Sequence, residues 1–266
     1  MRFLFTLLAL SISLMGCSSM DETHVSPHDT TAIRVATYNI KHGRGMDGTI
    51  DLERTAETLI SMDADIIALQ EVDDRARRSG DIDQASWLAD RLGMHAAYGS
   101  FMEFQGGRYG LAILSRQPIQ SYESWRLADG HEPRVALAAD ILTGSGDVIT
   151  MIVVHYDWVE DDGYRFDQAQ ETIRRIETLE TPWIVLGDFN DVPGSRTMVA
   201  FETIGRNVLK PVDDAATFPS GHPEVEIDHI ITGPADVWRP ASAMVIPESR
   251  TSDHRPVMSE LILIRN

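Results

Sequence analysis

The sequence has a single cysteine, few basic residues and no apolar run long enough to span a bilayer. With Cys17 alone, no disulfide can form within the 266-residue chain. Lysine and arginine total 23 against 41 aspartate and glutamate residues, which gives a formal net charge of -18 at pH 7. Because non-specific binding to polyanions depends on basic patches, this balance disfavours nucleic acid as a tightly bound partner. It does not exclude nucleic acid, since a bound divalent cation can reverse the local field.

Motifs that mark several large enzyme classes are also missing. The chain has no G-x-S-x-G, H-E-x-x-H or G-K-[ST] pattern, which argues against a serine-hydrolase elbow, a zinc-peptidase helix and a phosphate-binding P-loop. No internal repeat or low-complexity run occurs. Hydrophobic residues make up 43% of the chain, enough for one large core, so we expect a single domain after the N-terminal segment.

The N-terminus has the layout of an export signal. Arg2 is followed by an apolar stretch over residues 3–15 and then by Gly16 and Cys17. The letters "LMGC" resemble the bacterial lipoprotein processing box, in which cleavage before the cysteine leaves that residue to carry a lipid. A plain secretory signal with an incidental cysteine is the alternative.

We therefore predict a lipoprotein signal peptide over 1–16, lipidated Cys17 with a polar tether over 17–31, and a folded domain over 32–266. Ser18, rather than an aspartate, follows the cysteine, which by the same resemblance indicates sorting to an outer membrane. The expected location is the bacterial cell envelope, on its periplasmic or exterior face. The N-terminal lipid would supply the contact with the membrane.

Strand-like and helix-like stretches alternate after the tether. Residues 51–62 place apolar side chains on one helical face, with Asp51 as the expected N-cap, and residues 84–92 and 164–180 are also helical in pattern. Roughly eight to ten strand-like runs accompany three or four helices, and several strands follow one another without a helix between them. This order favours an α/β fold with two packed sheets and helices outside them.

Apolar strand-like runs in this sequence repeatedly end on a polar side chain. In "WIVLGDFN", Asp188 and Asn190 are two residues apart and share a face in extended chain, whereas Phe189 turns back into the core. The same pattern places further polar groups at strand ends or just before the last strand: Asn39, Glu71, His155, Asp228, Asp253 and His254. Each alone has an ordinary explanation as a turn former, a solvated edge or a core histidine. Together they predict a site assembled at one edge of a sheet sandwich.

The side chains in this set are oxygen donors and imidazoles. Carboxylates and carboxamides suit magnesium, manganese or calcium rather than zinc. A hard cation beside acids and histidines suits hydrolysis of a phosphoester. In such a site the metal takes charge from the phosphoryl oxygens, a carboxylate orients or deprotonates water, and an imidazolium stabilises the transition state.

Short motifs along the chain, in this order and at these separations, resemble the endonuclease/exonuclease/phosphatase superfamily: "YN", "LQE", "YGLAILSR", "VVHYD", "GDFND", "IDH" and "SDHRPV". That group includes pancreatic-type deoxyribonuclease, abasic-site endonucleases, inositol polyphosphate 5-phosphatases and neutral sphingomyelinases. "GDFN" together with "SDH" carries most of the specificity. The resemblance implies that 32–266 is a catalytic domain built as a four-layer α/β sandwich, two packed mixed β-sheets flanked by helices, with the site at one end of the sheets.

The resemblance also implies residue roles around a metal and a water. Glu71 would be the main metal ligand, supported by Asn39 and Asp253, with Mg2+ as the expected ion and Mn2+ or Ca2+ as alternatives. Asp188 would position or activate the attacking water. Asn190 would hold the phosphate or the water.

Further roles concern the phosphoryl oxygens and the substrate. His155 and His254 would contact phosphoryl oxygens, and Asp228 would orient His254 and raise its pKa, as a carboxylate partner does for an imidazole. Deoxyribonucleases of this superfamily carry a glutamate near Tyr109, where this chain has no acid. Arg108 or Tyr109 is expected to face the substrate instead.

An acidic stretch, "DWVEDDGYRF", follows the first of these histidines, where a DNA-facing loop would be basic. We therefore predict a lipid-anchored, magnesium-dependent phosphomonoesterase or phosphodiesterase, a monomer that acts on a small or lipid-linked phosphorylated substrate. A secreted nuclease of the deoxyribonuclease type is the first alternative. The second is a non-catalytic lipoprotein that binds a divalent cation or a protein partner.

Overall fold

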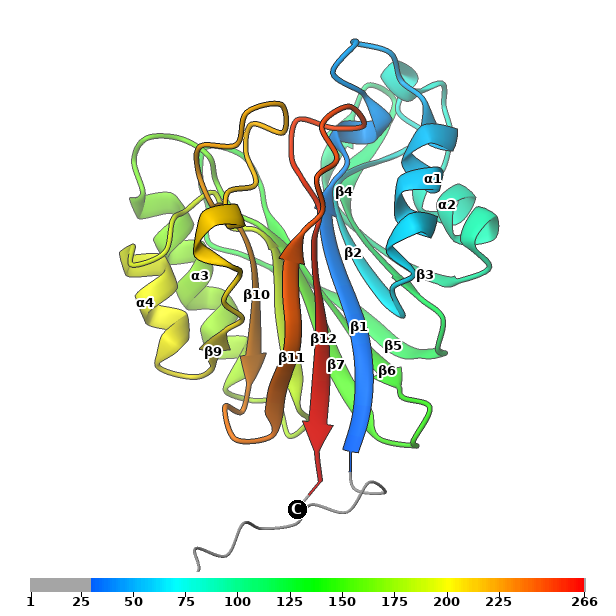
Figure 1. The fold of residues 1–266 in the computed structure, drawn as a ribbon. Helices are drawn as coiled ribbons and strands as arrows, with labels where there is room; N and C mark the ends of the chain where they lie inside the picture. The colour runs from blue at the N-terminus through cyan, green and yellow to red at the C-terminus, as the bar shows by residue number, and fades with distance from the viewer. Residues whose placement is uncertain (1–29, 266) are drawn as a thin grey trace, which may run out of the picture.

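Two six-stranded β-sheets lie face to face, and helices cover the outer face of each sheet (Figure 1). The computed structural model describes residues 30–265. The predicted signal peptide, Cys17 and most of the predicted tether lie outside the described residues. The predicted four-layer sandwich of two packed mixed sheets flanked by helices is confirmed.

Each sheet mixes parallel and antiparallel strand pairs. The first sheet consists, in spatial order, of β11 (Trp238–Val245), β12 (Val257–Ile264), β1 (Thr30–Asn39), β2 (Ile66–Asp74), β4 (Gly107–Ser115) and β3 (His95–Phe104). The second consists of β5 (Ile119–Arg126), β6 (Val135–Leu142), β7 (Val148–His155), β8 (Trp183–Asp188), β10 (Asp228–Gly233) and β9 (Arg206–Asn207). In each sheet one central pair is parallel, β1 with β2 and β7 with β8, so both strands of the pair end at the same edge.

Within residues 30–265, the outer layers are formed by α1 (Leu52–Met62), α2 (Gln84–Leu92), α3 (Gly163–Ile176) and α4 (Arg196–Glu202). The first two pack on the first sheet and the other two on the second (Figure 1). Asp51 starts α1 as predicted, because its side chain accepts a hydrogen bond from the backbone N–H of Arg54. None of the helices in this part of the chain combines the length and the apolar character needed to cross a membrane.

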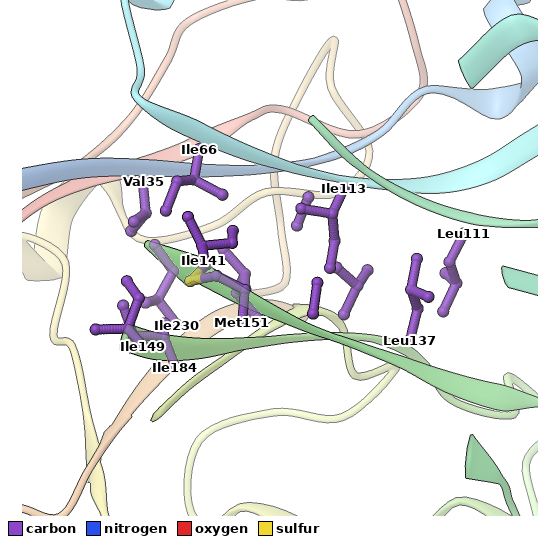
Figure 2. Close-up of a cluster of buried hydrophobic side chains, with 14 of the residues drawn as sticks. Val35, Ile66, Leu111, Ile113, Leu137, Ile141, Ile149, Met151, Ile184 and Ile230 are labelled. Carbon is purple, nitrogen blue, oxygen red and sulfur yellow. The ribbon is translucent and has the colours of Figure 1, made fainter. Parts of the chain in front are cut away.

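The main hydrophobic core lies between the two sheets and follows the two-residue period of the strands (Figure 2). Val35 of β1 and Ile66 of β2 point inward from the first sheet, and Met151 of β7 and Ile184 of β8 point inward from the second. All four side chains are almost completely buried. Because the layer between the sheets is hydrophobic, polar side chains that face it are found at the ends of the strands.

The structure has twelve strands in its described part, more than the eight to ten expected. The sequence analysis did not indicate β3 and β5, which are edge strands with several exposed residues, or β9, which has only two residues. Helix α3 ends at Ile176, earlier than the predicted end at Glu180. The predicted tether is also shorter at its C-terminal end, because Thr30 and Thr31 already belong to β1.

Strand β1 runs the length of the sandwich, so Thr30 and Asn39 lie at opposite ends of the molecule (Figure 1). Thr30 pairs with Ile264 of the last strand. Both ends of the described chain therefore lie at the end of the sandwich that is remote from Asn39.

Candidate active site

The predicted polar residues gather around one cavity of about 550 Å³ at the end of the sandwich where β1 ends. The predicted residues that line it are Glu71, Tyr109, His155, Asp188, Asn190, Asp253 and His254. Asn39 and Asp228 lie behind this surface, almost completely buried, and hydrogen-bond to lining residues. Both sheets contribute, and the contributing segments are far apart in the sequence.

Three adjacent strands of the second sheet place one imidazole and two carboxylates in a row. His155 ends β7 and is paired in parallel register with Asp188, which ends β8. Asp188 is in turn paired with Asp228, the first residue of β10. Gly187 permits this spacing, because a Cβ there would lie 2.0 Å from the carbonyl oxygen of Val154. Its φ of 153° is also one that glycine adopts more readily than other residues.

Oδ2 of Asp188 is the point on which the donors converge. It accepts a hydrogen bond from Nδ2 of Asn39 at 3.1 Å, and it lies 3.4 Å from Nε2 of His155 and 3.5 Å from Nε2 of His254. Burial raises the pKa of Asp188 to about 7, with a contribution from the charge of Asp228 and an opposing one from His254. A carboxyl group with a pKa near neutrality can exchange a proton with a bound water at physiological pH.

The two histidines of the site hold different protonation states. Nδ1 of His254 lies 2.9 Å from Oδ2 of Asp228. Burial alone would lower the pKa of His254, but the charges of Asp228 and Asp188 outweigh burial and raise it to about 10, so His254 is an imidazolium at neutral pH. Burial, followed by the positive charges of Arg134 and His254, lowers the pKa of His155 well below its usual range. His155 is therefore neutral.

The turn after β8 explains why two polar residues flank a phenylalanine. Asn190 adopts a left-handed conformation with a φ of 50°, and its Nδ2 donates to the carbonyl of Tyr156 at 3.0 Å. Phe189 is completely buried and packs edge to face on Tyr156, with ring centroids 5.4 Å apart. Asp188 and Asn190 thus both face the cavity, as their spacing predicts, while Phe189 anchors the turn in the core.

Glu71 reaches the cavity from an irregular part of β2. The pairing of β2 with β4 shifts register beside it, and Glu71 itself has a φ of 59°. Such a bulge re-aims a side chain away from the regular alternation of the strand. Nδ2 of Asn39 lies 3.1 Å from Oε1 of Glu71. Asp253, from the loop before β12, also lines the cavity, and its Oδ2 accepts a hydrogen bond from Nζ of Lys41 at 2.5 Å.

The group formed by Asn39, Glu71 and Asp253 fits a hard divalent cation. It offers two carboxylates and the Oδ1 of Asn39, which also accepts a hydrogen bond from the backbone N–H of Lys41 at 3.1 Å. Oxygen is the donor type that magnesium and calcium prefer. The Glu71 and Asp253 side chains keep 23% and 22% of their surface exposed, so an ion can approach them from the cavity.

A second, buried group could also bind a metal ion. Potential ligand atoms of Asp188, Asp228 and His254 all lie within 4.8 Å of one another. In this group, however, the imidazolium form of His254 has no nitrogen lone pair to offer, because its pKa is raised to about 10. The His254–Asp228 contact thus occupies part of this group, whereas the Glu71 and Asp253 carboxylates line the cavity.

Arg108 and Tyr109 are successive residues of β4, so their side chains lie on opposite faces of the strand. Tyr109 is buried, lines the cavity and packs edge to face on Phe101 with ring centroids 5.4 Å apart. Arg108 does not line the cavity; it is largely exposed and forms an ion pair with Asp74. Of the two residues expected to face the substrate, Arg108 or Tyr109, the structure therefore places Tyr109 in the cavity wall and Arg108 on the other face of the strand.

The structure adds lining residues that the sequence patterns did not indicate: Arg78, Met102, Phe104, Glu132, Arg134, Trp158 and Phe218. Arg134 directly precedes β6, which runs antiparallel to β7. The start of β6 therefore lies at the same edge of the sheet as the end of β7. The sequence could have indicated Arg134 as a site residue, because in "PRVALAA" this charged residue comes directly before an apolar strand. Most of the other site residues were found because they come at the end of such a strand.

The two packed sheets, the helices outside them and the polar cavity at one end of the strands define a four-layer α/β sandwich with its candidate site at a sheet edge. The model of the Endonuclease/Exonuclease/phosphatase family matches residues 36–254, so the chain belongs to this family. Its members hydrolyse phosphoester bonds and typically depend on a divalent metal. The family inferred from the sequence motifs is confirmed.

Known proteins match this chain over most of its length. The uncharacterized protein YbhP of Escherichia coli strain K12 is 28% identical over 250 residues, which are 87% of this chain and 97% of YbhP. A mannosyl-6-phosphatase from Bacteroides thetaiotaomicron VPI-5482 has a TM-score of 0.70 at 21% identity, covering 86% of this chain and 99% of that one. The human nocturnin catalytic domain, solved with a bound sulfate anion, has a TM-score of 0.69 at 20% identity, covering 88% and 96%. At these identities the structural matches establish the fold alone.

Proposed function

We propose that this protein is a divalent-metal-dependent hydrolase that cleaves phosphoester bonds in a small phosphorylated substrate. The observation that carries the proposal is the arrangement around Asp188. Its carboxylate meets one neutral and one protonated imidazole within 3.5 Å, and it lies at the wall of a cavity that also holds the Glu71 and Asp253 carboxylates. These are the groups that hydrolysis of a phosphoester requires.

Asp188 is the residue we expect to orient the attacking water and accept its proton, because burial brings its pKa to about 7. His254 and His155 both direct Nε2 toward Oδ2 of Asp188, so they can donate to phosphoryl oxygens beside it. Asn190 uses one amide N–H on the carbonyl of Tyr156 and has the second available for a phosphate oxygen. Asp228 acts through His254, whose charge and orientation it maintains.

Glu71, Asn39 and Asp253 are the residues we propose as holders of the cation, with Mg2+ expected and Mn2+ or Ca2+ as alternatives. When bound, such an ion withdraws charge from phosphoryl oxygens. Lys41 contacts the Asp253 carboxylate at 2.5 Å. This lysine would share that carboxylate with the ion or move away from it.

The surroundings of the cavity favour a small substrate over duplex nucleic acid. Glu132 lines the cavity, and Glu160 and Asp161 are exposed in the loop that follows the strand of His155. Binding a duplex requires basic groups that displace counterions from its phosphates. The acids at this edge would repel a polyanion, whereas a single phosphate can still be bound by His254 and a cation.

We further propose that Cys17 carries a lipid and that the protein is held in the bacterial cell envelope, at an outer membrane. Cys17 lies outside the described residues. The described chain begins with Thr30 at one end of β1 (Figure 1), and the cavity lies at the other end, where Asn39 hydrogen-bonds to the lining residue Asp188. A membrane anchor joined there would leave the cavity facing away from the membrane, which favours a soluble phosphoester over a lipid of the same membrane. One chain supplies both sheets and the whole cavity, so we expect a monomer.

A substrate panel assayed with magnesium and with EDTA tests the proposed activity. The panel contains p-nitrophenyl phosphate, bis-p-nitrophenyl phosphate, a sugar phosphate, a phosphoinositide and plasmid DNA. We expect metal-dependent hydrolysis of a small phosphoester. The rate should fall by about 100-fold or more in Asp188→Ala and in His254→Ala. His222→Ala, which changes an exposed histidine outside the cavity, is the matched control and should leave the rate unchanged.

Two results of this panel would overturn the proposal. Efficient cleavage of plasmid DNA at low nanomolar enzyme, with no turnover of small esters, would make the protein a nuclease. Tight binding of a divalent cation with no turnover of any substrate would make it a non-catalytic binding lipoprotein.

A further inference from the structure

Arg134 is a buried cation in the wall of the cavity with hydrogen-bond donors left over. Its side chain is only 2% exposed, and its Nη2 donates to Oε2 of Glu132 at 3.0 Å. Nε and Nη1 are also buried, and neither has a hydrogen-bond partner among residues 30–265. A guanidinium is always charged and has five N–H donors, and burying such donors unpaired is costly. The free donors of Arg134 therefore indicate a ligand that offers acceptor oxygens.

Arg134 lies at the sheet edge where the neighbouring strand ends on His155. Arg134 directly precedes β6, and β6 runs antiparallel to β7, whose last residue is His155. The guanidinium carbon of Arg134 lies 4.9 Å from the ring centroid of Phe101, and the His155 ring lies 6.1 Å from the same centroid. Arg134 and His155 thus share Phe101 as a neighbour, and both line the same cavity.

Resting on the phosphoesterase function proposed above, we infer that Arg134 binds the phosphate group of the substrate and that the preferred substrate is a phosphomonoester. The terminal phosphate of a monoester carries up to two negative charges and three non-bridging oxygens. A diester carries one charge and two such oxygens. His254 supplies one cationic donor beside Asp188, and Arg134 supplies a second from the strand next to His155, with two nitrogens free.

The charge of Arg134 is compensated only in part by its neighbours. Arg134 has Glu132 as its single acidic hydrogen-bond partner in the described chain, and that glutamate keeps 33% of its side chain exposed. Arg78, the other arginine in the wall, has Nε and Nη2 engaged by Asp73 at 2.8 and 2.7 Å. Of the two arginines that line the cavity, Arg134 therefore has the less fully compensated charge. Charge-assisted hydrogen bonds to phosphate are among the stronger ones in proteins.

The test compares two substrates that share one leaving group, p-nitrophenyl phosphate and methyl p-nitrophenyl phosphate, on wild type and Arg134→Met. We expect kcat/KM for the monoester to fall about 10- to 100-fold, the usual effect of losing a hydrogen bond to a charged group. The diester should lose at least several-fold less. Arg126→Met is the matched control, because Arg126 is exposed, pairs with Asp129 and does not line the cavity.

A second measurement does not depend on turnover. Titration of inorganic phosphate by calorimetry should give a dissociation constant about 10-fold or more weaker for Arg134→Met than for wild type. Arg134→Lys keeps the charge but removes the Nε and Nη1 donors, so it should show a smaller loss in the same direction. This variant also serves if Arg134→Met does not fold, which its circular dichroism spectrum and melting curve will show.

The inference is overturned if monoester and diester activities fall equally, or if phosphate affinity is the same in the variant as in wild type. Those outcomes would leave Arg134 as a packing residue held by Phe101 and Glu132. Failure of the proposed function gives a different result, because wild type would then hydrolyse neither ester. The phosphate titration would still report on Arg134 in that case.

Discussion

Nδ1 of His254 lies 2.9 Å from Oδ2 of Asp228, and both side chains are buried at the end of the sheet sandwich. The contact joins the loop before β12 of the first sheet to the start of β10 of the second. It holds a positive charge on His254 where water is largely excluded, and it directs Nε2 of the same ring to 3.5 Å from Asp188. The charge state of the site therefore depends on a contact that only the packing of the two sheets creates.

The His254–Asp228 contact should make stability fall at alkaline pH in the metal-free protein. The folded-state pKa of His254, about 10, is raised above the 6.5 of an unperturbed histidine. Protonation therefore favours the folded state, so this contribution is complete below about pH 6.5 and is lost as the pH rises through 10. Urea unfolding in EDTA between pH 6 and 10.5 should show the decline. Asp228→Asn should show a weaker decline, and equal slopes in the two proteins would contradict the assignment.

Glu71→Gln should weaken binding of a divalent cation, because it removes the carboxylate that the bulge in β2 directs into the cavity. Calorimetric titration with Mn2+ should give an affinity about 10-fold or more below that of wild type. Asp228→Asn should bind the ion nearly as well as wild type, since the Asp228 carboxylate is engaged by His254. The reverse order of affinities would place the cation in the buried group instead.

Gly187→Ala should destabilise the protein and separate His155 from Asp188. The added Cβ would lie 2.0 Å from the backbone oxygen of Val154, so β7 and β8 would have to move apart. We expect the free energy of unfolding to fall by about 1–3 kcal/mol, together with a loss of hydrolysis. Gly221→Ala is the matched control, because nothing lies within 4 Å of a Cβ at that position. Equal stability of the two variants would show that the strands tolerate the methyl group.

Cys17→Ser should release the protein from the membrane if Cys17 is the lipidated residue. Cells grown with labelled palmitate should incorporate label into wild type and not into the variant, and the variant should appear in the soluble fraction. The Asp188→Ala protein, changed far from the N-terminus, should be labelled like wild type. Labelling of Cys17→Ser, or membrane release of both variants, would contradict the lipoprotein prediction.

Much of the fold and many of the site residue types were predictable from local patterns. Side chains alternate between the two faces of a strand, so "WIVLGDFN" already predicts that Asp188 and Asn190 face one way and Phe189 the other. The cap of α1 at Asp51 is equally local, because a side chain and a backbone N–H three residues later determine it. The missing motifs were enough to argue against several enzyme classes, and the order of the motifs that are present was enough to indicate the family.

Only the tertiary structure decided which of these groups meet and in what state. The register of β7, β8 and β10 sets His155, Asp188 and Asp228 side by side. Burial lowers the pKa of His155 and raises the pKa of Asp188. The bulge that turns Glu71, the outward position of Arg108 and the free donors of Arg134 depend on strand pairing between distant segments. Sequence periodicity indicates which face of a strand is buried. It does not indicate which residue of another strand will lie beside a given side chain, or how far packing will exclude water from that side chain.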